Sequence, residues 1–194
     1  MADGKVITGY SNPFVALYQE SNGTVTYSGG RKLARGVDVS TDITTTEDNK
    51  FYADNVVAES AKRKFASGTL NLTVDGLLAE AERMIHGLPA ADTDGFTHYG
   101  DEATYPYCGF GCVIRYQSGG VESYTAFVLR KIRFSQSGTS AATQQEDVDW
   151  QTQALSAEIM RDDTATHDWK YQAEDLATEA AAIAKVKSAL NIAA

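Results

Sequence analysis

Two runs of alternating residues between Gly36 and Asp75, separated by a polar excursion, constrain the fold of this chain more than any other stretch. On the apolar side the first run carries Val37, Val39, Thr41 and Ile43, and the second carries Leu70, Leu72 and Val74. A period of two is the pattern of a half-buried strand, because successive side chains point to opposite faces of a sheet. The stretch therefore predicts a long hairpin with one apolar face and one polar face.

The polar face of this predicted hairpin is rich in carboxylate, amide and hydroxyl groups. Its residues are Asp38, Ser40, Asp42, Thr69, Asn71, Thr73 and Asp75. The excursion between the strands, residues 45–55, is also polar but contains Phe51 and Tyr52 near its middle. A solvent-exposed turn does not need two aromatic rings, and such rings are typical anchors of protein interfaces. We therefore expect this loop to control association rather than folding.

The rest of the sequence predicts more strands and two helices. Strands are expected over 14–20, 24–28, 107–117, 121–134, 150–160 and 168–172, and helices over 77–86 and 175–191. Residues 1–13 are expected to form a polar N-terminal arm, and residues 88–105 a surface loop. Together these elements predict a mainly β, single-domain fold: an antiparallel β-sandwich or partly open barrel of seven to nine strands with two packed α-helices.

Charge argues against a nucleic-acid reader, and hydropathy argues against a membrane protein. The 194-residue chain has a formal net charge of −9 and a pI of about 4.8, whereas phosphate recognition needs a basic surface. Its two short basic clusters, Lys62-Arg63-Lys64 and Arg130-Lys131 with Arg133, are expected on exposed strand faces. No apolar run approaches the roughly 18 residues of a membrane span, and Met1–Gly4 lack the apolar core of a signal peptide. We expect the chain to fold in the cytoplasm.

Residues that could support catalysis or metal binding form no recognisable constellation. Cys108 and Cys112 would lie about 13 Å apart on a strand, which is beyond disulfide reach, so we expect buried structural thiols. The three histidines lack metal-ligand spacing, and no nucleophile elbow or phosphate-binding loop is present. Asp147, Asp149, Asp162 and Asp163 are expected to be solvated loop charges, and Trp150 and Trp169 core or interface anchors. We predict no enzymatic activity, no cofactor and no metal.

Several segments resemble a known family in the same order along the chain. Phe51-Tyr52-Ala53-Asp54-Asn55, followed by Glu59, is similar to the "fYADN…E" segment of major tail proteins, the tail-tube subunits of long-tailed, non-contractile bacteriophages. The later similar segments are Leu77-Leu78 through His86-Gly87, Pro106-Tyr107-Cys108-Gly109-Phe110-Gly111, Tyr124 to Phe134, and Ala177-Thr178-Glu179-Ala180. The acidic, glycine-rich loop at 90–105 departs from the family pattern.

The resemblance implies a structural virion protein that is made and assembled in the host bacterial cytoplasm. In that family, hexameric rings stack head to tail, and the sheets of the subunits close into one continuous barrel through which DNA passes without specific binding. By position, the polar face would line the lumen. The ring-stacking loop would include Glu47, Asp48, Asn49, Lys50, Phe51, Tyr52, Asp54 and Asn55. Tape-measure, tail-terminator and tail-tip proteins would be its partners.

A carbohydrate- or protein-binding β-sandwich module is the alternative that the sequence leaves open. Such a module explains the mainly β composition but accounts less well for the long two-faced hairpin and its aromatic excursion. A monomer would also leave the edges of the extended sheet open, which is a liability unless they are paired or covered. Assembly of purified protein into tubes would discriminate between the two readings.

Overall fold

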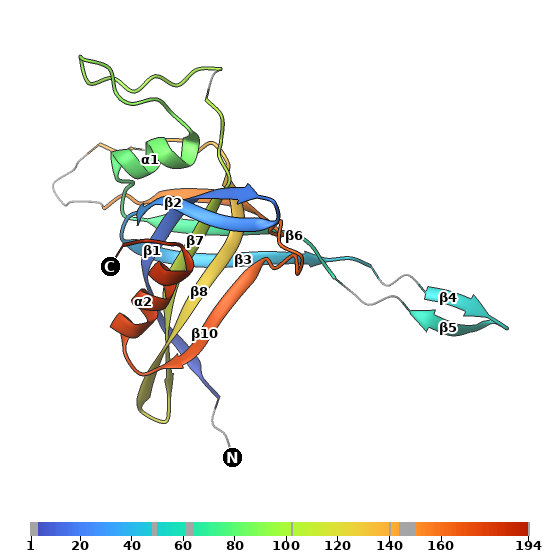
Figure 1. Ribbon diagram of the computed structural model, residues 1–194. Coiled ribbons are helices and arrows are strands. Elements are labelled where there is room, and N and C mark those ends of the chain that lie inside the picture. Colours follow the sequence, from blue (N-terminus) through green and yellow to red (C-terminus); the bar gives the residue numbers. More distant parts are fainter. Residues whose placement is uncertain are drawn as a thin grey trace.

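The computed structural model describes residues 4–47, 50–60, 64–101, 103–139, 141–143 and 150–193, without the side chains of 51, 52 and 56–60. Ten strands and two helices occur in this part of the chain (Figure 1). They are β1 (Val6–Ser21), β2 (Thr24–Lys32), β3 (Gly36–Thr45), β4 (Lys50–Ala53), β5 (Val56–Ser60), β6 (Phe65–Val74), α1 (Ala79–His86), β7 (Cys108–Ser118), β8 (Val121–Phe134), β9 (Gln153–Met160), β10 (Lys170–Leu176) and α2 (Glu179–Ala189).

Eight of the strands form one antiparallel sheet that does not close on itself. Its order is β2-β1-β7-β8-β9-β6-β3, and β10 pairs with β8 beside this path. The expected mainly β, antiparallel fold with two helices is confirmed. The strands do not form the two separate sheets of a sandwich. The reason is the length of β8, whose residues 124–129 pair with β10 while residues 131–134 pair with β9. One strand therefore joins what would otherwise be two sheets.

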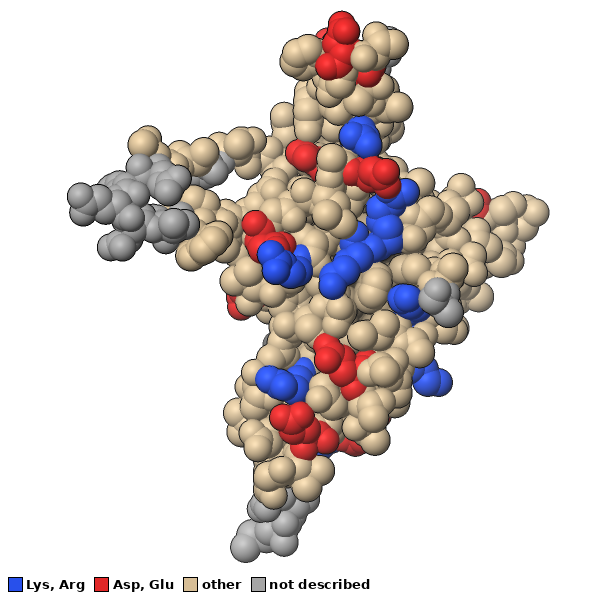
Figure 2. Space-filling view, turned by 90° about the vertical axis from the view of Figure 1, so that its left-hand side faces the viewer, with Lys and Arg blue, Asp and Glu red and all other residues tan. Residues whose placement is uncertain are grey.

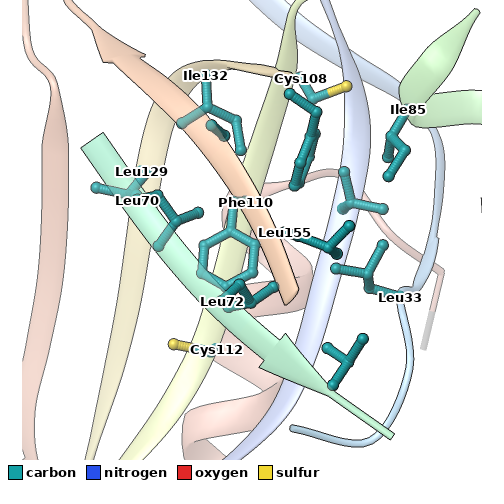
Figure 3. Close-up of a cluster of buried hydrophobic side chains, with 14 of the residues drawn as sticks. Leu33, Leu70, Leu72, Ile85, Cys108, Phe110, Cys112, Leu129, Ile132 and Leu155 are labelled. Carbon is teal, nitrogen blue, oxygen red and sulfur yellow. The ribbon is translucent and has the colours of Figure 1, made fainter. Parts of the chain in front are cut away.

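The main core is formed by the buried apolar side chains that alternate along β6, β9, β7 and β8 (Figure 3). The fully buried side chains at its centre are Phe110, Leu70, Leu129, Ile132 and Ile159. Helix α1 adds Ala81 and Ile85 to the same cluster. The period of two predicted for residues 70–74 is confirmed, since Leu70, Leu72 and Val74 are all buried.

A second cluster forms where α2 packs on the opposite face of β7 and β8. A Cβ atom at Gly109 would lie 2.7 Å from Leu190, and one at Gly111 would lie 2.5 Å from Val186. The two glycines therefore leave the space that the helix occupies, which gives the Gly-Phe-Gly run a packing role. Thr178 caps α2, because its side chain accepts a hydrogen bond from the Ala181 backbone N–H at 3.2 Å.

Several boundaries differ from the sequence prediction. Residues 6–13 are not an arm: they form the first half of β1 and pair with β7 from Val6 opposite Gln117 to Ser11 opposite Val113. This pairing depends on a distant strand, so local polarity concealed it. Trp150 is 85% exposed and precedes β9, whereas Trp169 stacks on Phe65 at a ring distance of 4.8 Å and contacts the core.

The C-terminal end of α1 buries a histidine. Gly87 follows it in the left-handed conformation, and a Cβ atom there would lie 1.9 Å from the Thr104 carbonyl oxygen. His86 is 2% exposed and packs edge-to-face against Tyr105. Burial lowers the pKa of His86, against opposing effects of Glu82 and of a hydrogen bond with the Ser135 backbone. Folding therefore favours the neutral form of the His86 imidazole.

The free energy of unfolding is expected to decrease as the pH falls through the usual histidine pKa of about 6.5. Acid favours unfolding because His86 binds a proton more readily in the unfolded chain than in the folded one. Urea unfolding at pH 7.5, 6.5 and 5.5 measures this, and His86→Leu should remove that part of the decrease. An identical pH dependence in the variant would contradict the assignment. The carboxylates of Asp75, Asp92 and Asp163, whose pKa values are lowered by their hydrogen bonds, affect stability only at more acidic pH.

Candidate functional site

The polar residues predicted for the hairpin face lie opposite one another across β3 and β6. Asp38 pairs with Thr73, Ser40 with Asn71, and Asp42 with Thr69. All are exposed except Thr73, which is half-buried. The Asn71 amide donates a hydrogen bond to the Asp42 carboxylate at 3.0 Å. The structure thus brings six of the seven residues together on one solvent-facing surface, which we call the polar face.

The polar face continues onto β9 and the end of β8. Asn71 lies opposite Ser156, Thr69 lies opposite Glu158, and Glu158 lies opposite Arg133. Arg133 and Glu158 form a half-exposed ion pair at 3.1 Å. Sequence reasoning did not include Ser156 and Glu158, although they alternate with Leu155, Ala157 and Ile159. The missing information was the register that places β9 beside β6.

Asp75 differs from the other six residues because its carboxylate is already bound. One oxygen accepts a hydrogen bond from the Arg35 backbone N–H at 2.9 Å, and the other pairs with the Arg35 guanidinium. These hydrogen bonds lower the pKa of Asp75. Asp75 therefore joins the start of β3 to the end of β6 rather than adding a free charge to the polar face.

Beyond the polar face the chain extends into a hairpin that projects away from the body (Figure 1). Within residues 45–55, expected as a loop, Lys50–Ala53 are strand β4 and pair with β5. The turn between the strands is Asp54-Asn55, with φ values of 49° and 61°. Two consecutive residues with positive φ are typical of a type I′ turn, for which Asn and Asp are favoured. That dipeptide was the signal that sequence reasoning overlooked.

The stacking-loop candidates can be placed only in part. Glu47, Lys50, Asp54 and Asn55 are exposed, whereas Asp48 and Asn49 lie outside the described residues. Phe51 and Tyr52 belong to β4, and the structure describes their backbone alone. The hairpin begins where Thr46 and Lys64 meet: the Thr46 N–H donates to the Lys64 carbonyl at 2.8 Å. Among the described elements, β4 and β5 pair only with each other.

Strand β3 forms one end of the sheet path, so no described strand pairs with its outer edge. Val37 and Ile43, expected on the apolar face, are 55% and 38% exposed. Near its start β3 passes over β1, where a Cβ atom at Gly36 would lie 2.1 Å from the Tyr10 ring. The sheet thus curls until β3 approaches β1 without closing, and it leaves an edge with exposed apolar side chains along which no described strand pairs.

The basic cluster at the end of β8 is not the exposed strand surface that we expected. The Arg130 guanidinium is 2.7 Å from the Asp162 carboxylate, and the Asp162 side chain is fully buried. Lys131 pairs with Asp163 at 2.5 Å, and Asp163 also accepts a hydrogen bond from Tyr18 at 2.8 Å. Asp162 is therefore not a solvated loop charge. These carboxylates bind the β9–β10 connection to β8 and neutralise the cluster.

The two cysteines are buried and free, as expected. Burial raises the pKa of Cys108 to about 12 and that of Cys112 further. In the part of the chain that the structure describes, no three His, Cys, Asp or Glu side chains gather as metal ligands. None of its helices is long and apolar enough to span a bilayer. No protein-family model matches the sequence, and no curated protein is significantly similar to it.

Proposed function

We propose that this protein is a structural subunit that assembles with copies of itself into a tube, like the phage tail-tube subunits that its sequence resembles. The observation that carries the proposal is the extended β3–β6 pair, which combines an exposed polar face, an open strand edge and a projecting hairpin. The surface features of this pair are not needed to stabilise a monomer. An extended strand pair with one apolar and one polar face is suited to contacts between subunits.

Ring closure would remove the open edge. No described strand pairs with the outer edge of β3, where Val37 and Ile43 are half-exposed, so a strand from a neighbouring subunit can extend the sheet there. Repeating that contact around an axis closes the sheets of several subunits into one barrel, in six copies by analogy with the resembled family. The β4–β5 hairpin would then contact the next ring, and such head-to-tail contacts produce open filaments.

In the proposed barrel the polar face lines the lumen. Asp38 and Asp42 contribute exposed carboxylates, and the Arg133–Glu158 ion pair adds no net charge. A passage for DNA should not hold the duplex, because each cation–phosphate contact adds affinity and slows movement. Carboxylate and hydroxyl groups repel phosphates or hydrate them, so DNA would pass without specific binding. The proposed setting is the virion, with tape-measure, tail-terminator and tail-tip proteins as further partners.

Negative-stain electron microscopy of the purified protein tests this proposal directly. We expect stacked rings or tubes with a central channel. Persistent monomers across a wide range of protein and salt concentrations would argue instead for the binding-module alternative. The polar face requires a separate test, because tubes alone do not show which surface lines the channel.

Changing Asp38 and Asp42 to lysine should leave the fold intact, since both side chains are exposed, but should make the channel bind DNA. Assembled variant tubes are expected to co-sediment with duplex DNA at low salt and to release it at high salt, whereas wild-type tubes should not retain it. The matched control is Asp101→Lys with Glu174→Lys, which changes the net charge equally at exposed positions away from the polar face. Equal DNA retention by both variants would show that the lumen assignment is wrong.

A further inference from the structure

The surface loop between α1 and β7 has an ordered tip built around one aspartate. One carboxylate oxygen of Asp92 accepts hydrogen bonds from the backbone N–H groups of Asp94 at 3.0 Å and Phe96 at 2.8 Å. The other oxygen lies 2.8 Å from the His98 ring. In the backbone, the Asp92 N–H donates to the Phe96 carbonyl at 2.9 Å. The tip is therefore preorganised, although its composition is that of a flexible loop.

This ordered tip holds aromatic rings out in solvent. Phe96 is 68% exposed and Tyr99 is 57% exposed, and the Tyr99 hydroxyl is tied to Glu82 of α1 at 3.0 Å. Aromatic side chains on a preorganised loop bind with little further loss of conformational freedom. A solvent-exposed phenylalanine gives no stability to its own chain. The Phe96 ring is therefore available to a contact partner.

The tip is acidic, and a basic surface lies elsewhere on the same molecule. Between Arg83 and Arg115 the sequence has no lysine or arginine, while Asp92, Asp94 and Asp101 lie on or beside the tip. Figure 2 shows a group of acidic side chains at its top, the height at which the loop lies in Figure 1, and a row of basic side chains on the body below. The tip thus carries acidic side chains, while basic side chains, with some acidic ones beside them, lie on the body below.

A groove of about 600 Å³ lies between β2, the start of α1 and the C-terminal residues. Its walls are largely apolar, with Gly30, Leu78, Ala81 and Ile192, and Leu78 is 54% exposed. Arg31 and Lys32 lie at its rim. Arg31 is paired at 2.6 Å with Glu80, which also lines the groove, whereas the Lys32 ammonium donates a hydrogen bond to the neutral Asn12 amide oxygen at 3.2 Å. The groove therefore offers an apolar floor and a net basic rim.

We propose that the 92–99 tip of one copy docks in this groove on a second copy, with Phe96 against Leu78 and Ile192 and with Asp94 near Lys32. The occupant follows from complementarity: an acidic loop bearing an exposed ring fits an apolar groove with a basic rim. Within one chain the tip leaves its own groove empty, because Phe96 remains exposed. The contact joins two different surfaces, so its repetition produces a ring or a filament. It uses neither the polar face nor the β4–β5 hairpin.

Disulfide trapping between two full-length variants tests the contact. One chain carries Thr93→Cys, on the tip beside Phe96, and the other, with an affinity tag, carries Ala79→Cys in the groove, so Phe96 and Leu78 are kept. Mild oxidation of the mixture should give a disulfide-linked heterodimer. Cys108 and Cys112 are fully buried and contribute no reactive background. The matched control pairs Thr93→Cys with Val121→Cys, since Val121 is 70% exposed and lies at the turn between β7 and β8. Trapping with Ala79→Cys but not with Val121→Cys is the expected result.

Equal trapping with both positions, or none with either, would overturn the proposed contact. Tube formation is scored separately by electron microscopy. Tubes without trapping would reject the proposed contact but not the proposed tube. Trapping without tubes would reject the proposed tube but not the contact. In the trapping pair, Asp94→Lys in the Thr93→Cys chain should lower the heterodimer yield about two- to fivefold, the range expected for an exposed charge pair. Lys32→Glu in the Ala79→Cys chain should restore the yield. Yields unchanged by these charge reversals would show that charge does not direct the docking.

Discussion

Replacing residues 47–63 by an Asn-Gly turn is expected to abolish tube assembly while the melting temperature of the subunit stays within a few degrees of wild type. Because Thr46 and Lys64 are already hydrogen-bonded across the base of the hairpin, a two-residue turn can join them. Among the described elements, β4 and β5 pair only with each other, so their loss removes no contact from either core cluster. Thermal melting measures the fold, and sedimentation with electron microscopy measures assembly.

A narrower variant separates the aromatic rings from the hairpin backbone. Phe51→Ala with Tyr52→Ala keeps the chain length and the Asp54-Asn55 turn, yet each ring at a buried contact would contribute about 2 kcal/mol or more to association. We expect folded subunits that assemble poorly, because every subunit in a ring repeats the loss. Normal tubes from the deletion variant would reject the stacking role of the hairpin. A lower melting temperature in the double variant would instead place the rings in a folded core.

Changing Arg130 to methionine is expected to lower the free energy of unfolding by about 3–5 kcal/mol, because it leaves the Asp162 carboxylate buried without its partner. The guanidinium donates to Asp162 through Nε at 2.9 Å and lies over the Tyr171 ring at 4.4 Å. Asp162 in turn accepts a hydrogen bond from the Thr164 hydroxyl at 2.7 Å. The variant should therefore loosen the connection between β9 and β10 as well. Urea unfolding monitored by tryptophan fluorescence measures the loss.

Two further variants make this expectation specific. Adding Asp162→Leu to Arg130→Met should recover much of the stability, since no unpaired charge then remains buried. Arg133→Met is the matched control: its ion pair with Glu158 is half-exposed, so removing it should cost no more than about 1 kcal/mol. Equal losses for Arg130→Met and Arg133→Met would mean that burial does not determine the contribution of these pairs.

Local pattern was a reliable guide where burial on one side decides the structure. The alternation at Leu70, Leu72 and Val74 predicted a half-buried strand, and β6 is that strand. The stripe of apolar residues before Gly87 predicted a helix that ends there, and α1 ends at His86 with Gly87 in the left-handed conformation. Each of these signals depends on residues within a few positions of one another. Periodicity and turn chemistry therefore suffice to read them.

Charged residues show where local pattern fails. Arg130 and Asp162 look alike in sequence to Arg133 and Glu158, since all four are polar residues in or beside strands. The first pair is buried and the second is half-exposed, because β8 changes partners between β10 and β9 near Arg130. Exposure of a charge depends on which strands meet around it. That information is distributed over the whole chain.

The amino-acid sequence alone determined the mainly β class, the two helices and the polar composition of the β3–β6 pair, because side-chain alternation and helix-end residues act over short distances. Only the tertiary structure decided that the strands form one unclosed sheet, that residues 6–13 join it, and that Ser156 and Glu158 extend the polar face. Strand register and sheet edges arise from hydrogen bonds between residues far apart in the chain. A period of two specifies which side of a strand is buried, but it does not specify the neighbouring strand.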